Sequence, residues 1–145
     1  REMSSDLERA VSILNQGYTL AAVNGDETVA STERGVKPLL DLLDSERSLN
    51  GYCVADKVVG KGAGHLYALL KPSEIFASVI SKPAYEILVK ERIPIQYGIL
   101  VESIINRSKT DICPIERAVM GIDDNEIALC RIRKRLSELS AGSKS

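Results

Sequence analysis

Two lysines four residues apart, Lys57 and Lys61, are the clearest sign of a binding site in this sequence. If a helix begins at Asp56, these side chains lie on one face of its first turn. Free backbone amides and the helix dipole favour an anion at that position. The spacing therefore predicts a site for a phosphate or a carboxylate, with Asp56 beside the two lysines.

The glycine-rich stretch 60–64 around Lys61 matches no known phosphate-binding loop. It has neither the Gly-x-x-x-x-Gly-Lys-Ser/Thr spacing nor the Gly-x-Gly-x-x-Gly spacing. A purely structural explanation is that the glycines let the helix pack closely on a sheet while Asp56 neutralises the lysines. The sequence leaves this explanation and the anion site open.

Cys113 is the candidate nucleophile. It precedes Pro114, which suits the first position of a helix, and Glu116 follows in the first turn. Because helix N-termini lower thiol pKa values, Cys113 is predicted to react faster than Cys53 in a core strand or Cys130 on an apolar helix face. The alternative is an inert cysteine.

Asn106 and Arg107 lie in the polar segment before Cys113. An arginine there could bind a carboxylate or phosphate through two hydrogen bonds, or it could hold the loop in place. With Glu116, these residues are candidates for orienting a substrate beside Cys113. His65 is the only histidine and has no partner at metal-binding spacing, so we expect a packed or surface side chain.

The elements that must position these residues alternate along the chain. Hydrophobic periodicity predicts helices at 5–16, 36–43, 58–70, 83–90, 114–120 and 124–139, and strands at 18–23, 28–32, 52–55, 75–80 and 95–100. Asn24-Gly25 predicts an antiparallel hairpin, whereas the later strand and helix alternation implies parallel pairing. We therefore expect an α/β fold with a mixed sheet of about five strands.

Bulk properties indicate one folded domain. The chain has 145 residues, of which 44% are hydrophobic and 27% charged, and we expect a single domain over 1–139 with a frayed tail at 140–145. A net charge of -1 and few aromatic residues make nucleic acid an unlikely partner. No apolar run reaches the ~20 residues of a membrane helix. Three widely spaced cysteines favour a reducing, cytoplasmic location.

Three separated motifs resemble one protein family. They are Arg34-Gly35-Val36-Lys37-Pro38-Leu39, Ala55-Asp56-Lys57-Val58-Val59-Gly60-Lys61, and Ile105-Asn106-Arg107 followed by Cys113-Pro114-Ile115-Glu116. On these motifs the chain resembles the prokaryotic domain-of-unknown-function family 1893. The resemblance implies a three-layer fold similar to cytidine deaminases, with helices on both faces of the mixed sheet and a cleft where two helix N-termini meet. It implies no known activity.

Zinc deaminases carry His-x-Glu on the first of those helices and Pro-Cys-x-x-Cys at the start of the second. Here Tyr67 stands two residues after His65, and the segment Ser81-Lys82-Pro83-Ala84-Tyr85-Glu86-Ile87 contains no cysteine. The general acid/base and the thiolate ligands are both missing. We therefore predict no zinc deamination, no bound metal and no cofactor.

These residues support three hypotheses. The leading one is a deaminase-like scaffold without zinc ligands that binds a small anionic or nucleotide-like ligand. Its candidate ligand-binding residues are Asp56, Lys57, Lys61, Ser81, Asn106 and Arg107. The second is a non-zinc enzyme with Cys113 as nucleophile and Glu116 as a further catalytic residue. The third is a structural subunit of a homo-oligomer.

Overall fold

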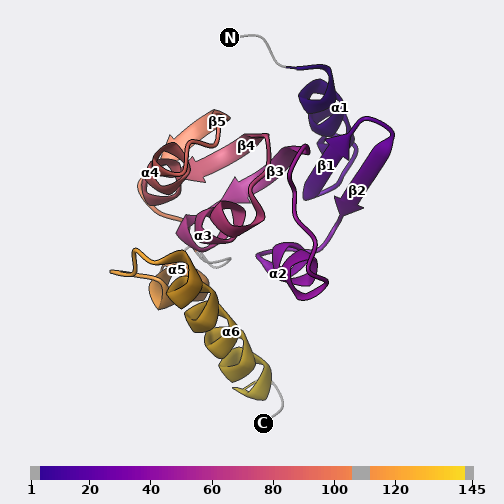
Figure 1. Ribbon diagram of the computed structural model, residues 1–145. Helices are drawn as coiled ribbons and strands as arrows, with labels where there is room; N and C mark the ends of the chain where they lie inside the picture. The colour runs from indigo at the N-terminus through magenta and orange to yellow at the C-terminus, as the bar shows by residue number, and fades with distance from the viewer. Residues whose placement is uncertain (1–3, 106–111, 143–145) are drawn as a thin grey trace.

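The computed structural model of this chain describes residues 4–105 and 112–142. Helices and strands alternate through most of this part of the chain (Figure 1). The helices are α1 (Ser5–Leu14), α2 (Lys37–Asp44), α3 (Lys61–Leu70), α4 (Lys82–Lys90), α5 (Pro114–Ala118) and α6 (Asn125–Gly142). The strands are β1 (Leu20–Asn24), β2 (Glu27–Ser31), β3 (Cys53–Val59), β4 (Glu74–Ser81) and β5 (Ile95–Val101).

The strands form one mixed sheet in the order β2-β1-β3-β4-β5. Strand β1 pairs antiparallel with β2 and β3, whereas β3, β4 and β5 are parallel. The parallel strands are linked by α3 and α4, because a parallel connection needs a crossover. The expected five-stranded mixed sheet is confirmed.

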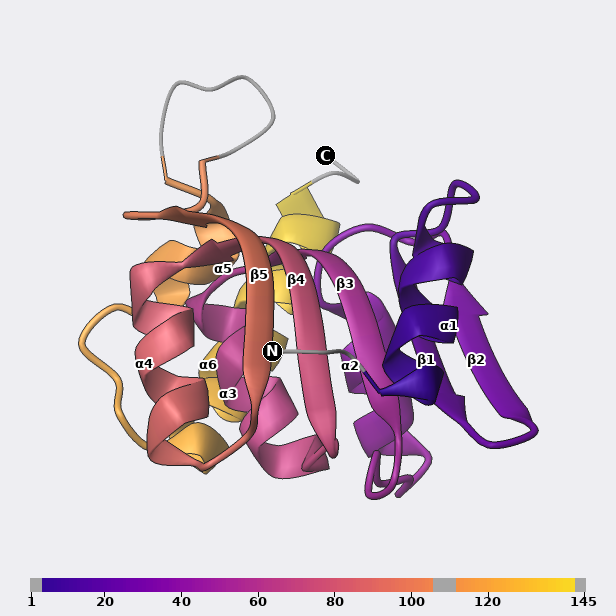
Figure 2. The ribbon, with the colours of Figure 1, turned by 90° about the horizontal axis from the view of Figure 1, so that it is seen from above.

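Helices cover both faces of this sheet. Figure 2 shows α1 on one face, over β1 and β3, and α2, α3 and α4 on the other. Helix α6 packs on the outer side of α3, so α3 lies between the sheet and α6. This arrangement confirms the expectation of helices on both faces.

The largest part of the core forms around α3. Leu66, Tyr67 and Leu70 of this helix are almost fully buried and belong to the same apolar cluster as Ile75 and Ile80 of β4. A smaller cluster joins α1 to the opposite face of β1 and β3. Its buried members are Ala10, Leu14, Ala21, Val23 and Ala55. Burial of these side chains stabilises the layered arrangement.

The boundary between β3 and α3 differs from the sequence prediction. The helix was expected from about Asp56, but β3 continues to Val59 and α3 begins at Lys61. Val58 and Val59 are β-branched and pair in register with Val79 and Ile80 of β4. Asp56 and Lys57 therefore lie on a strand and not in the first turn of a helix.

Smaller differences from the sequence prediction occur at the ends of other helices and strands. The hydroxyl oxygen of Ser4, and not of Ser5, accepts the amide hydrogen of Leu7 and caps α1. In the hairpin Asn24 pairs with Glu27, so the turn residues are 25 and 26. Residues 140–142, expected in a disordered tail, continue α6, and 143–145 lie outside the described residues.

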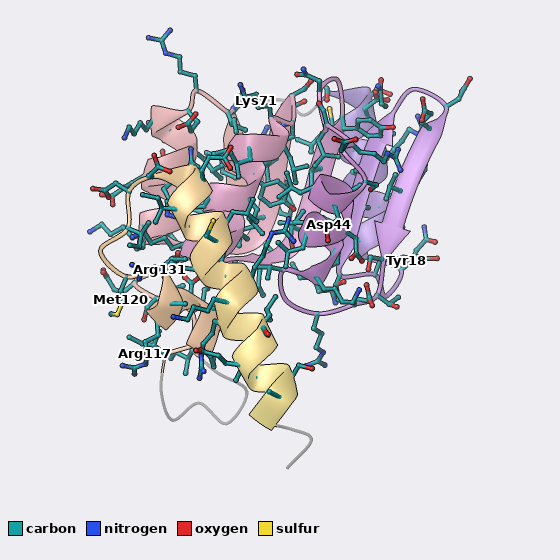
Figure 3. The ribbon with its side chains drawn as sticks, turned by 60° about the horizontal axis from the view of Figure 1, so that its bottom comes forward. Tyr18, Asp44, Lys71, Arg117, Met120 and Arg131 are labelled. Atoms are coloured by element: carbon teal, nitrogen blue, oxygen red, sulfur yellow. The ribbon has the colours of Figure 1, made fainter. Side chains whose placement is uncertain are left out.

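The C-terminal half of α6 extends past the rest of the molecule (Figure 3). Ala128 and Ile132 of this helix are buried against the core, whereas most residues after Leu136 are exposed. The guanidinium of Arg133 on α6 lies 2.7 Å from the Asp44 carboxylate at the surface. Within the described ranges, no helix has the length and apolar character needed to cross a membrane.

Candidate functional site

The N-terminus of α3 holds a carboxylate from the protein itself. Glu116 of α5 accepts the backbone amide hydrogens of Lys61, at 2.6 Å, and of Gly62, at 2.8 Å. Its side chain is buried. Because unpaired amides and the helix dipole stabilise a negative charge here, Glu116 takes the position expected for a bound anion.

The glycines around Lys61 make room for this contact. A Cβ atom on Gly60 would lie 2.6 Å from the carboxyl carbon of Glu116, and one on Gly62 would lie 2.8 Å from a side chain of α5. A Cβ atom on Gly64 would lie 3.3 Å from Cα of Ala84 in α4. Close packing therefore explains the glycines, but against α4 and α5 and not against the sheet.

Lys57 and Lys61 do not share a helical face. Lys57 is exposed on β3, whereas the ammonium group of Lys61 donates a hydrogen bond to the carbonyl oxygen of Val119 at 2.9 Å. The predicted two-lysine site at a helix start is therefore wrong in its geometry. Lys57 instead lines a separate cavity.

Ser81 and His65 make contacts within the protein. The buried hydroxyl of Ser81 accepts the amide hydrogen of Ala84 at 3.3 Å and caps α4. Nδ1 of the buried His65 lies 2.7 Å from Oδ1 of Asn125, whose amide donates to Glu91 at 3.2 Å. His65 is thus packed, as expected, and a ligand contact by Ser81 stays a prediction.

A cavity of about 280 Å³ opens beside β3, next to the start of β1 and the segment that leads into α2. Figure 1 shows these elements next to one another. The cavity is lined by Thr19, Leu20, Glu33, Arg34, Gly35, Pro38, Leu39, Asp56, Lys57 and Val58. Apolar walls with a few charged groups are the usual composition of a small-molecule site. This cavity is the candidate functional site.

Local backbone geometry positions its charged residues. Gly35 has a φ of 72°, a left-handed conformation that suits glycine, and it turns the chain between Arg34 and α2. The hydroxyl of Thr19 donates to the carbonyl oxygen of Glu33 at 2.6 Å. The carbonyl oxygen of Thr19 accepts the amide hydrogen of Lys57 at 3.1 Å. Thr19, just before the start of β1, therefore connects both walls of the cavity.

Asp56 is the chemically distinctive residue of the cavity. The hydroxyl of Tyr67 donates to its Oδ2 at 2.6 Å, and the amide of Val58 donates to its Oδ1 at 3.3 Å. Burial raises the pKa of Asp56 from 3.8 to about 7, although these hydrogen bonds favour the charged form. A carboxyl group that lines a cavity and has this pKa exists in both protonation states at neutral pH, as is common at functional sites.

The phenol of Tyr67 is the hydrogen-bond donor in its pair with Asp56. Burial is the main cause that raises the pKa of Tyr67 well above 10, and the nearby Asp56 raises it further. The phenol therefore remains protonated and keeps donating its hydrogen bond to Asp56.

Two cations share the cavity with two acidic residues. Arg34 and Lys57 carry the positive charges, and Glu33 and Asp56 are the acids. Glu33, Arg34 and Lys57 are exposed. Between residues 4–105 and 112–142, neither Arg34 nor Lys57 forms an ion pair. Both cations are therefore available to a ligand.

Sequence comparison gives a match over most of the chain. Residues 9–136 match TM1506, a domain of unknown function (DUF1893). The chain belongs to the DUF1893 family. The crystal structure of a DUF1893 family protein, TM1506 from Thermotoga maritima, is 29% identical and superposes with a TM-score of 0.81, covering 95% of this chain and 93% of that one. This likeness confirms the α/β fold. No curated protein matches significantly.

The three cysteines of this DUF1893 protein lie apart. Cys53 is buried on β3, 3.5 Å from the Glu74 carboxylate, and burial raises the pKa of its thiol. Cys113 is partly buried at the start of α5, and Cys130 is exposed on α6. The prediction that Cys130 lies buried on an apolar face is wrong, because the buried stripe of α6 passes through Ile132 instead.

The surroundings of Cys113 in the DUF1893 structure add little to the nucleophile hypothesis. Glu116 is occupied by the amides of α3, so it is not free to orient a substrate. Asn106 and Arg107 lie outside the described residues. The described parts of the chain contain no group of three or more His, Cys, Asp or Glu side chains suited to a metal ion.

Sequence reasoning selected Asp56 and Lys57 but missed Glu33, Arg34 and Tyr67 as site residues. Arg34 stands in one of the motifs that resembled the DUF1893 family, so a signal for it was present. No signal existed for Tyr67. Its contact with Asp56 depends on a helix that follows the strand and folds back over it, whereas the sequence prediction placed both residues on one helix.

Proposed function

We propose that this DUF1893 protein binds a small anionic or nucleotide-like ligand on a cytidine deaminase-like scaffold that lacks the zinc motif. The ligand lies in the cavity beside β3. One observation carries the proposal: Arg34 and Lys57, which have no ion-pair partner in the described ranges, share this cavity with Asp56, whose pKa is raised to about 7. A volume of about 280 Å³ suits a ligand no larger than a mononucleotide.

The lining residues suit different parts of such a ligand. Arg34 can bind a phosphate or carboxylate through two parallel hydrogen bonds, and Lys57 adds a second positive charge. Asp56 offers a hydrogen-bonding carboxyl group to a base or amide. Leu20 and Leu39 supply apolar contact area for a ring.

The sheet order and the two helices that begin after neighbouring parallel strands support the deaminase-like description. Glu116 lies against the start of α3, and Ser81 caps the start of α4. Both helix starts therefore have internal partners. For this reason we assign the ligand to the cavity beside β3. Because the sequence lacks the zinc motif, we also predict that the purified protein carries no stoichiometric zinc.

The test is calorimetric titration of the purified protein with inorganic phosphate and with AMP, CMP, GMP and UMP. We expect the double variant Arg34→Ala/Lys57→Ala to weaken binding of any recognised probe at least ten-fold. Lys134→Ala on the exposed surface of α6 removes the same kind of charge and should change nothing. Absence of binding by all five probes, or equal binding by the double variant, would refute the proposal.

Lys61→Ala separates this cavity from the helix start that the sequence suggested. The ammonium group of Lys61 contacts the carbonyl oxygen of Val119, so its loss should lower stability and leave ligand affinity unchanged. A loss of affinity equal to that of Lys57→Ala would move the site to α3.

The other hypotheses remain predictions. These are the Cys113 nucleophile, the homo-oligomer subunit and the cytoplasmic location. Covalent labelling of Cys113 by a substrate analogue, sedimentation analysis and cell fractionation test them in turn.

A further inference from the structure

The cavity beside β3 is lined by acidic as well as basic residues and is not simply cationic. Its lining contains two basic residues, Arg34 and Lys57, and two acidic ones, Glu33 and Asp56. A ligand that carried only negative charge would satisfy the cations but would face the acidic residues without a matching group. Unmatched charges of like sign oppose binding. A ligand with one group of each sign would match both pairs.

Asp56 is arranged to accept hydrogen bonds from such a ligand. Its oxygens accept hydrogen bonds from the Tyr67 hydroxyl and the Val58 amide, and the Lys57 amide also favours the charged form. A carboxylate has about four acceptor positions, so acceptor capacity remains for a ligand in the cavity that Asp56 lines. The Tyr67 hydroxyl already donates to Asp56, and the Thr19 hydroxyl lies within hydrogen-bond distance of two backbone carbonyls. A ligand group that donates a hydrogen bond would use the remaining acceptor capacity of Asp56.

We propose that the ligand is zwitterionic, an inference that rests on the proposed function. It carries a phosphate or carboxylate that binds Arg34 and Lys57 and, a few bonds away, an ammonium or amino group that binds Asp56. Amino acids and aminoalkyl phosphates are the simplest members of this class. Asp56 is then the residue that separates these molecules from simple anions of the same size.

The direction of proton exchange on binding distinguishes the two classes of ligand. The titratable and charged groups around Asp56 are Tyr67 from α3, which donates to it, and Lys57, Glu33 and Arg34, which line the same cavity. An ammonium group favours the ionised form of Asp56, so a zwitterion releases up to about half a proton from Asp56 on binding near pH 7. A simple carboxylate favours the protonated form, so its binding takes up protons, whereas a phosphate monoester also titrates near pH 7 and adds its own proton release.

The experiment uses the full chain and two matched pairs of probes, phosphoethanolamine with ethyl phosphate and 4-aminobutyrate with butyrate. Titrations at pH 7 in two buffers of different ionisation enthalpy give both the affinity and the number of protons exchanged. We expect the amino member of at least one pair to bind ten-fold or more tightly than its partner, and we expect 4-aminobutyrate, if it binds, to release protons where butyrate takes them up. The pair that responds tells whether the anionic group is a phosphate or a carboxylate.

Variants complete the test. Asp56→Asn should lower the affinity of the amino probe to that of its partner, whereas Arg34→Ala should lower the affinity of both members of the pair. Equal affinities within both pairs would overturn the zwitterion inference and leave the anion site standing. Absence of binding by these probes, by phosphate and by the nucleotides would overturn the proposed function as well. The proton measurement needs no variant, so the test does not depend on the folding of Asp56→Asn.

Discussion

Replacing Asp56 with asparagine should make the protein more stable above pH 7 and change its stability little near pH 4. Burial raises the pKa of Asp56 from 3.8 to about 7, so the folded protein keeps a proton that the unfolded chain has lost. Such a group stabilises the folded state below pH 3.8, and this contribution is lost as the pH rises through about 7. Asparagine cannot ionise, so the variant avoids that loss.

The structure sets the size of the effect. The interval from 3.8 to about 7, at about 1.4 kcal/mol for each pH unit, gives an upper limit of about 4 kcal/mol. Asparagine in the same rotamer keeps an acceptor for Tyr67 but turns an N–H group toward the amide of Val58. Losing that acceptor offsets about 1 kcal/mol. We therefore expect a net gain of roughly 2–3 kcal/mol at pH 8.

The assay is urea unfolding of both proteins between pH 4 and pH 9. The difference in the free energy of unfolding, plotted against pH, should rise between pH 4 and pH 7 and then level off. Asp26→Asn, at an exposed aspartate in the hairpin turn, is the matched control and should give a flat line. A flat line for Asp56→Asn, or a variant less stable than wild type at pH 8, would show that burial of Asp56 does not have the stated cost.

Three further predictions concern the α3 start and the cysteines. Glu116→Ala should lower the free energy of unfolding by about 2–4 kcal/mol, because two amides lose a buried acceptor, and Glu116→Gln should cost less in the same urea assay. Gly60→Ala should lower the free energy of unfolding by about 1–3 kcal/mol, because its Cβ meets the Glu116 carboxylate. The double variant Gly60→Ala/Glu116→Ala should lose clearly less stability than the sum of the two single losses. Strict additivity of the two losses would contradict this contact. Iodoacetamide should label exposed Cys130 before buried Cys53 in the native protein, as followed by mass spectrometry. Faster labelling of Cys53 than of Cys130 would contradict the described burial.

The sequence predicted the parallel half of the sheet well. The strand at 75–80, the helix at 83–90 and the strand at 95–100 agree with β4, α4 and β5 to within one or two residues. Each has a consistent hydrophobic period, and Pro83 marks the beginning of the helix. Local signals and tertiary packing favour the same elements here.

Prediction failed where tertiary contacts decide the local structure. Helical spacing of apolar residues from Val58 onward suggested a helix, but pairing with β4 extends β3 to Val59. The role of Glu116 could not be predicted either, because its partners lie 54 and 55 residues earlier in the chain. Asp56 and Lys57 were selected for a helix-start site and instead line a cavity built from three distant segments.

The contact between Glu116 and α3 also has a consequence for synthesis of the chain. Lys61 and Glu116 are separated by 55 residues, which a ribosome adding about 5–20 residues per second takes roughly 3–11 s to make. Strands β3 and β4 and helix α3 are thus synthesised before the carboxylate that completes the start of that helix. Until Pro114–Ala118 follows, the first amides of α3 depend on water. A nascent chain stalled before α5 should therefore hold its parallel strands in a looser, protease-sensitive state.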